Sequence, residues 1–136
     1  MKILMFDSPE FWYRTFSKTL ESVESMNEEK TVKDSIVIFL QSESEDESQN
    51  ERVLEKAVSN ISWLAKKVGR VKITLHSFAH LSESKSSIEF AKKMIKSIKS
   101  KLIEKGFEVD MTPFGYFLEF KIHVNGESLA KVWKSI

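Results

Sequence analysis

The spacing of hydrophobic residues in the first third of the chain is that of β-strands. Residues 2–6 form an apolar run, and residues 10–16 are rich in aromatic and β-branched side chains, so each segment predicts a strand. The Asp-Ser-Pro sequence at 7–9 is typical of a turn and predicts a hairpin between them. After a polar stretch at 17–34, residues 35–40 are continuously apolar, which predicts a strand that is buried on both faces or covered by helices.

Two later segments repeat apolar residues at the period of an amphipathic helix. These segments are residues 51–68, which Gly69 follows as a favourable helix end, and residues 84–105, which Gly106 follows. Further strands are predicted where apolar and polar residues alternate: 70–77, 107–111 and 117–124.

The resulting order is three strands, a helix, a strand, a helix and two strands, with a short amphipathic tail at 128–136. This order is typical of a two-layer α/β domain, with a mixed β-sheet and helices packed mainly on one face. A chain of 136 residues has the size of one domain, and no linker or internal repeat interrupts it. Residues 1–136 are therefore expected to form a single domain.

Composition excludes several functional classes. Hydrophobic residues make up 41% of the chain and charged residues 30%, the balance of a soluble globular protein. The absence of cysteine excludes disulfides, zinc sites with cysteine ligands, iron–sulfur clusters and thiol catalysis, and it favours a cytoplasmic location. No apolar run approaches the roughly 18 residues of a membrane span, and residues 1–6 are too short for a signal peptide.

Three histidines are candidates for chemistry: His76, His80 and His123. His76 and His80 have the spacing of zinc ligands on a helix, but here they straddle a strand end and a loop without an obvious third ligand, so no metal site is expected. We interpret His76 as a surface residue of its strand. His80 follows the carboxyl end of that strand, where α/β sheets bind ligands, so it is a candidate site residue with a structural role as the alternative.

Charge is balanced over the whole chain, with 21 basic and 20 acidic residues, but not within the second predicted helix. That helix carries many lysines and few acidic residues. A solvated face is the commoner role of such a run, and a surface for a polyanion is the other interpretation. The acidic stretch at 41–51 is interpreted as a solvated loop whose first residues could lie over a site.

Three segments together resemble a known family. They are Phe-Ala-His-Leu-Ser at 78–82, Thr-Pro-Phe-Gly-Tyr at 112–116 preceded by Gly-Phe-Glu-Val, and Phe-Lys-Ile at 120–122 followed by Leu-Ala at 129–130. In this order and spacing, over essentially the whole chain, they look like the N-terminal editing domain of archaeal-type threonyl-tRNA synthetase.

The resemblance implies a D-aminoacyl-tRNA deacylase-like fold, a homodimer, and hydrolysis of L-serine wrongly attached to threonine tRNA, without cofactor or metal. A second, smaller sieve is physically sensible because binding discriminates one methyl group by only ~1–3 kcal/mol. The implied chemistry relies on main-chain groups and on the 2′-hydroxyl of the tRNA. The D-aminoacyl-tRNA deacylases carry a Gly-Pro dipeptide that this chain lacks, which favours an L-amino acid.

The resemblance also assigns site residues. His80 is the candidate catalytic residue. The expected substrate-binding residues are Gln41, Ser42, Phe78, Ala79, Phe114, Gly115, Tyr116 and Phe117. The tRNA-binding residues expected from the lysine-rich second helix are Lys92, Lys96 and Lys99, and Lys121 is added to them.

The chain departs from the family pattern in one aromatic residue, since Phe117 stands where the family has a second tyrosine, and at two ionisable positions. Leu118 stands where the family has a lysine, and Lys131 stands where it has a glutamate. Either the domain is inactive or catalysis does not depend on those side chains. The alternatives to an editing hydrolase are therefore a non-catalytic module that binds the tRNA acceptor end and a D-aminoacyl-tRNA deacylase. No synthetase catalytic core is present, so an excised domain or the front of a longer protein is expected.

Overall fold

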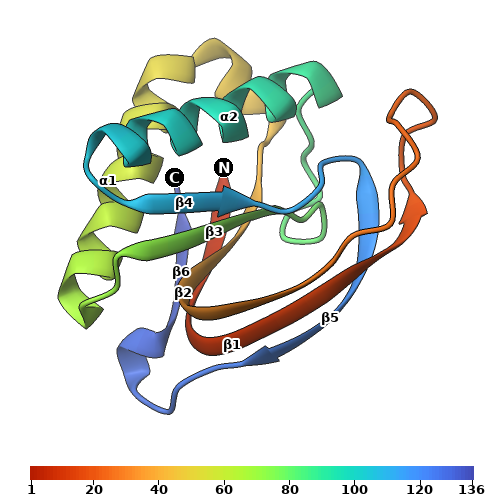
Figure 1. The fold of residues 1–136 in the computed structure, drawn as a ribbon. Helices are drawn as coiled ribbons and strands as arrows, with labels where there is room; N and C mark the ends of the chain where they lie inside the picture. Colours follow the sequence, from red (N-terminus) through yellow and green to blue (C-terminus); the bar gives the residue numbers. More distant parts are fainter.

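The computed structural model describes residues 1–136 and contains one curled sheet with two helices on one of its faces (Figure 1). The strands and helices, in chain order, are β1 (Lys2–Lys18), β2 (Glu29–Gln41), α1 (Asn50–Val68), β3 (Lys72–Ser77), α2 (Ile88–Glu104), β4 (Glu108–Met111), β5 (Tyr116–His123) and β6 (Lys131–Ser135). Two short 3-10 turns precede α1 and β6: Ser44–Ser48 and Ser128–Ala130.

The sheet is mixed, as the sequence predicted. Its strand order is β4-β3-β2-β1-β5, and β6 pairs with the first part of β1. β2, β3 and β4 run parallel, whereas β1 is antiparallel to β2, β5 and β6. Both helices pack against the same face, so the two-layer α/β architecture is confirmed (Figure 1). Neither helix has the length and apolar character needed to cross a membrane.

The first strand corrects the predicted hairpin. β1 is one continuous strand that keeps a single antiparallel register with β2, and the Asp-Ser-Pro sequence lies within it. Pro9 cannot donate a hydrogen bond to the ladder, and Asp34 of β2 has a φ of 52° near the same point. These residues therefore bend the two strands without reversing the chain.

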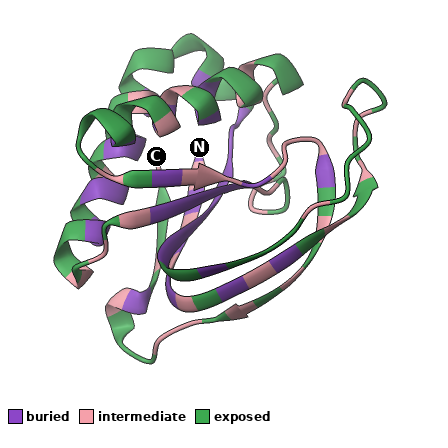
Figure 2. Cartoon of the chain, viewed as in Figure 1, coloured by how far each residue is buried: buried purple, intermediate pink, exposed green.

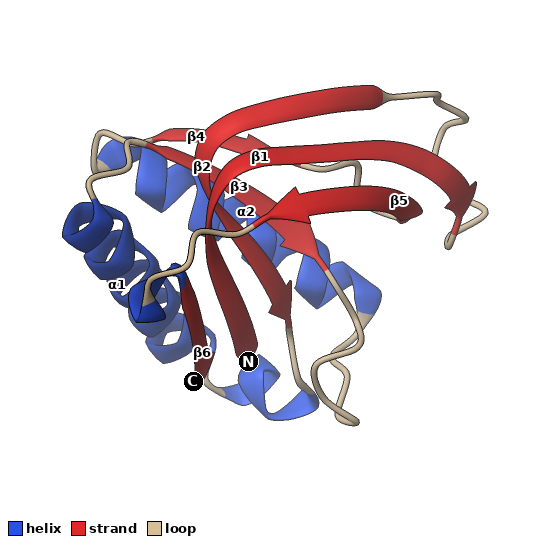
Figure 3. Cartoon of the chain, turned by 90° about the horizontal axis from the view of Figure 1, so that it is seen from below, coloured by secondary structure: helices blue, strands red, loops and turns tan.

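The bend exchanges the faces of β1. Before it, Ile3 and Met5 point into the main core between sheet and helices, and after it Phe11 and Tyr13 point into a second cluster on the opposite face. Regular alternation would keep all four on one face, so the exchange needs irregular backbone between them. Figure 3 shows the curved outer half of β1 with β5 beside it, and Figure 2 shows the buried stretches along the central strands.

Two further expectations change. The amphipathic tail contains β6, which pairs with β1 so that Trp133 lies opposite Leu4. The acidic stretch after β2 is not a simple solvated loop, because Glu43 and Asp46 are buried there. Both changes come from contacts with the start of β1, which the local sequence does not reveal.

Candidate functional site

A cavity of about 350 Å³ lies at the carboxyl ends of β2 and β3. The start of α2 closes one side of this cavity, and the segment from Pro113 to Leu118, together with Phe120, closes another. Ligands commonly bind at this end of parallel strands, because the loops that follow the strands converge there. The main candidate site is therefore this cavity.

The cavity brings together both halves of the family motif. Its lining includes all the residues that the sequence assigned to catalysis or substrate binding: Gln41, Ser42, Phe78, Ala79, His80, Phe114, Gly115, Tyr116 and Phe117. Segments that are more than thirty residues apart in the chain thus face one another. Their roles in binding and catalysis remain predictions.

Gln41 holds the loop that carries His80. Its Oε1 accepts hydrogen bonds from the backbone N–H groups of Leu81 at 2.7 Å and Ser82 at 2.9 Å. Its Nε2 donates to the carbonyl oxygens of Ser82 and Ser84, each at 2.9 Å. Because both polar atoms of this amide are engaged by the loop, the structure gives Gln41 a positioning role that sequence spacing did not reveal.

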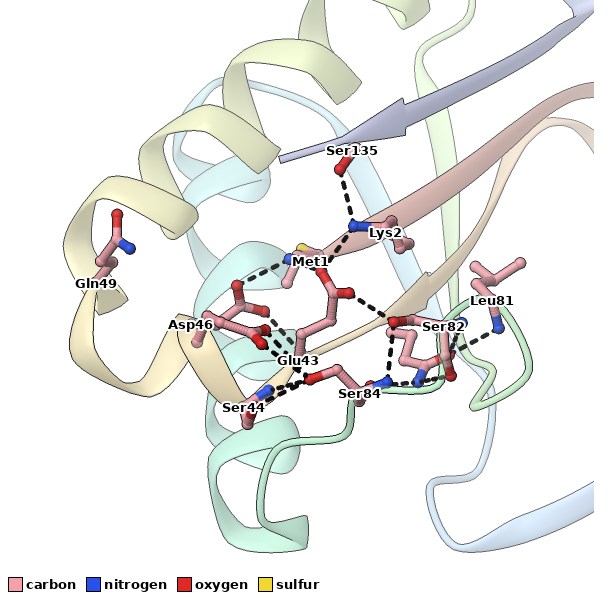
Figure 4. A network of polar contacts seen from close by, with 12 residues as sticks. Met1, Lys2, Glu43, Ser44, Asp46, Gln49, Leu81, Ser82, Ser84 and Ser135 are labelled. Carbon is pink, nitrogen blue, oxygen red and sulfur yellow. Dashed lines mark hydrogen bonds and ion pairs between the residues drawn. The ribbon is translucent and has the colours of Figure 1, made fainter.

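A network of polar contacts joins the same loop to the N-terminus of the chain (Figure 4). Glu43 accepts a hydrogen bond from Ser82 Oγ at 2.6 Å, and its other carboxylate oxygen contacts the Met1 ammonium at 2.7 Å and Lys2 Nζ at 3.0 Å. Asp46 also contacts the Met1 ammonium, at 2.8 Å. Burial acts to raise the pKa of Glu43, but the hydrogen bonds from the Met1 ammonium, Ser82 and Lys2 outweigh it and lower that pKa to about 2.

The two histidines on either side of the β3 end have different surroundings. His80 is exposed, and its ring packs edge-on against Phe78 with centroids 5.1 Å apart. His76 is buried in the cavity wall, which corrects its interpretation as a surface residue. It points away from the main core because Ile73 and Leu75 occupy the alternate positions of β3. No group of three histidine or acidic side chains converges to hold a metal ion.

The connection between β1 and β2 forms a wall of the cavity that the sequence did not predict. Thr19 and Leu20 line the cavity, and the Thr19 N–H donates to Gly115 O at 2.8 Å. The Tyr116 hydroxyl donates to Glu24 O and accepts from Met26 N, so it fastens this connection to β5. These residues lie in a polar stretch whose pattern gives no sign of a site.

Gly115 is required where this connection approaches β5. Its φ is 86°, in the left-handed region that favours glycine, and an added Cβ would lie 2.8 Å from Val23 Cγ1. A side chain at this position would therefore push the connection away from the cavity.

The two ionisable positions that depart from the family pattern lie in different places. Leu118 lines the cavity, so an apolar side chain stands in the wall where the family has a lysine. Lys131 begins β6 opposite Phe6 and does not line the cavity. Half of the residues that line the cavity are hydrophobic, and the ionisable side chains among the others include His76, His80 and Lys85.

The predicted tRNA-binding lysines do not form one surface. Lys92, Lys96 and Lys99 follow one another along α2, which packs near the β3–β4 end of the sheet. Lys121 lies on β5 at the opposite edge, with its Nζ 5.5 Å from the centre of the Trp12 ring. Phe120, its neighbour on β5, lines the cavity, so Lys121 points to the other face of the sheet.

Comparisons with known proteins agree over the whole chain. A family model described as the archaea-specific editing domain of threonyl-tRNA synthetase matches residues 1–136. The threonine–tRNA ligases of Thermococcus gammatolerans and Methanosphaera stadtmanae are each 33% identical to it over 139 residues, and that of Pyrococcus horikoshii is 32% identical. Each alignment covers 100% of this chain and 22% of the relative, so the chain spans about a fifth of the length of these relatives.

A solved structure shows the same fold. The protein named c-Myc DNA Unwinding Element Binding Protein superposes with a TM-score of 0.71 at 14% sequence identity. The superposition covers 100% of this chain and 99% of that chain. The likeness therefore extends over the complete two-layer architecture.

Proposed function

Since this chain belongs to the archaea-specific editing-domain family of threonyl-tRNA synthetase, we propose that it hydrolyses the ester of L-serine mischarged on threonine tRNA. The observation that carries the proposal is the single cavity lined by both family motifs. Water would attack the acyl carbon, the ester C–O bond would break, and the 3′-oxygen of the terminal adenosine would leave with a proton.

Selectivity for serine would come from a small cavity with rigid walls. Ala79 presents only a methyl group, and Gly115 is held by its contact with the β1–β2 connection. The loop that carries Ala79 is fixed by Gln41. Since rigid walls cannot yield to the extra methyl of threonine, sterics would add to the ~1–3 kcal/mol that binding alone provides.

Catalysis would rest on main-chain and substrate groups where the family's lysine is replaced by Leu118. Main-chain N–H groups aimed at a developing oxyanion can contribute ~3–4 kcal/mol, and they need no ionisable side chain. The 2′-hydroxyl of the terminal adenosine lies next to the ester in any aminoacyl-tRNA, so it is available to assist. His80 lies on the motif loop, is exposed and lines the cavity, so it is the candidate protein group at the ester.

The tRNA would follow α2 away from the cavity. Lys85, in the loop before this helix, and Ile88, its first residue, line the cavity, so the helix leads outward from the site. Of the α2 lysines, Lys101 alone forms an ion pair, with Glu104, so Lys92, Lys96 and Lys99 are free to meet phosphates. This placement supports the polyanion interpretation of the lysine face.

The test is hydrolysis of aminoacyl-tRNA by residues 1–136 alone. Threonine tRNA charged with L-serine should be deacylated, while the same tRNA charged with L-threonine should persist. Hydrolysis of D-aminoacyl-tRNA instead would identify a D-aminoacyl-tRNA deacylase. Binding of the tRNA without hydrolysis of any ester would identify a non-catalytic acceptor-end module.

A further inference from the structure

His76 is a buried ionisable residue in the cavity wall that the proposed reaction leaves without a role. It is 5% exposed, and three aromatic rings surround it. Its ring centroid lies 4.9 Å from that of Phe39, 5.8 Å from that of Phe78 and 6.2 Å from that of Phe120. These contacts pack the ring among aromatic side chains on the face of β3 that lines the cavity.

Thr112 is the hydrogen-bond partner of one nitrogen of the His76 ring. Its Oγ1 lies 2.9 Å from His76 Nδ1, and this is its one hydrogen bond. Thr112 is buried, and its N–H donates to Leu75 O at 2.9 Å, which holds it beside β3. A buried hydroxyl with a single partner favours donating its proton to that partner, which would make Nδ1 the acceptor and leave the ring proton on Nε2.

The ring is neutral at physiological pH. Burial lowers the pKa of His76 to about 4, and no carboxylate lies against the ring to oppose this effect. The imidazole therefore presents one N–H donor and no net charge.

His76 Nε2 faces the cavity. It forms no hydrogen bond within the protein. The fully enclosed side-chain polar atoms without a partner are Ser8 Oγ and Ser42 Oγ, so Nε2 is not fully enclosed. Nε2 is therefore reached from open space, and the space beside His76 is the cavity that it lines.

We propose that His76 donates a hydrogen bond from Nε2 to an oxygen of the aminoacyl group bound in the cavity, and that Thr112 is the positioning residue that sets its tautomer. The acceptor is the acyl carbonyl oxygen or the side-chain hydroxyl, and the assignment rests on the proposed function of the site. A neutral imidazole donor suits an ester carbonyl, because it stabilises developing negative charge without delivering a proton.

Matched variants separate the donor from its packing. His76→Phe keeps an aromatic ring against its neighbours and removes the donor, whereas His76→Gln keeps an amide N–H near the Nε2 position. We expect His76→Phe to lower seryl-tRNA hydrolysis by at least about tenfold, toward the 10²–10³-fold loss of one oxyanion donor, and His76→Gln to retain clearly more activity. An equal loss on alanyl-tRNA identifies the carbonyl as acceptor, and a smaller loss on alanyl-tRNA identifies the hydroxyl. A folded His76→Phe variant with activity within about twofold of the parent overturns the proposal.

Nitrogen NMR of the imidazole tests the same point without turnover. In the unliganded domain, the His76 spectrum should show a neutral ring protonated on Nε2. Thr112→Val should shift the tautomer balance and Thr112→Ser should restore it, an effect that loss of packing alone would not reverse. A ring protonated on Nδ1 overturns the proposal.

A stable ligand distinguishes failure of this proposal from failure of the hydrolase function. The probe is L-serine joined by an amide to the 3′-position of 3′-amino-3′-deoxyadenosine, which the domain cannot hydrolyse as an ester. Its binding should move the Nε2 resonance of His76 even if the domain proves inactive on seryl-tRNA. An unchanged Nε2 resonance at high probe concentration overturns the His76 assignment, whether or not hydrolysis is observed.

Discussion

Replacing Gln41 should loosen the loop that carries His80 before it unfolds the domain. Gln41→Leu keeps the size of the side chain and removes four hydrogen bonds to the loop backbone. At about 0.5–1.5 kcal/mol each, their full loss would cost up to about 6 kcal/mol. The loop groups are part-buried, so water replaces some of these bonds, and we expect a loss of about 2–3 kcal/mol in the free energy of unfolding.

Hydrogen exchange and activity together read out this effect. The amides of Leu81 and Ser82 should exchange at least tenfold faster in Gln41→Leu, while those of the central strands follow the global stability alone. The rate of seryl-tRNA hydrolysis should also fall when the loop becomes less ordered, because Ala79 and His80 lie on the loop. The matched control is Gln49→Leu at an exposed position before α1, where a change within about 0.5 kcal/mol is expected. Unchanged protection of the two loop amides would refute the positioning role of Gln41.

Four other predictions follow from the same geometry. Replacing three lysines of α2 by alanine should reduce the magnitude of the slope of log affinity against log salt for tRNA by about 2–3, as counterion release requires. The residues are Lys92, Lys96 and Lys99. An unchanged slope would show that this face is only solvated and does not bind tRNA. The Glu43 carboxyl has a pKa lowered from 4.5 to about 2, so the native state holds its proton less readily than the unfolded chain. The stabilising contribution of this carboxylate should be complete above pH 4.5 and disappear as the pH falls toward 2. The stability of Glu43→Gln should therefore depend less on pH in this range than that of the parent. Identical acid-unfolding profiles of the two proteins would contradict the prediction. Gly115→Ala should destabilise the domain by about 1–3 kcal/mol in urea unfolding through its positive φ and the clash with Val23, and the same change at Gly126, which has open space, is the control. The homodimer that the family resemblance implies predicts twice the chain mass in light scattering, and a monomeric mass at micromolar concentration would contradict it.

The sequence by itself determined the elements whose signal is local. The helical period predicted a helix at 51–68, and α1 spans Asn50–Val68. It predicted a second helix at 84–105, but α2 begins four residues later, at Ile88, because Ser87 Oγ accepts from Phe90 N and caps the helix there. The two family motifs predicted part of the cavity lining, including Phe78, Ala79, His80, Phe114 and Gly115, because each motif is contiguous in the chain.

Tertiary structure decided the features that depend on distant partners. The Asp-Ser-Pro sequence predicts a turn, yet β1 continues through it because β2 pairs with β1 in one antiparallel register on both sides of this sequence. Glu43 reads as a solvated acid, yet it is buried because the Met1 ammonium, Lys2 and Ser82 converge on it.

The cavity shows the same division. The alternation of β3 places His76 on the face opposite Ile73 and Leu75, which a half-buried strand would expose to solvent. This face is buried because β2 and β5 bring the rings of Phe39 and Phe120 against His76. The Thr19–Leu20 wall exists because Tyr116, far along the chain, holds the β1–β2 connection with its hydroxyl. Burial and hydrogen-bond partners are properties of the whole packing, so no local pattern could have specified them.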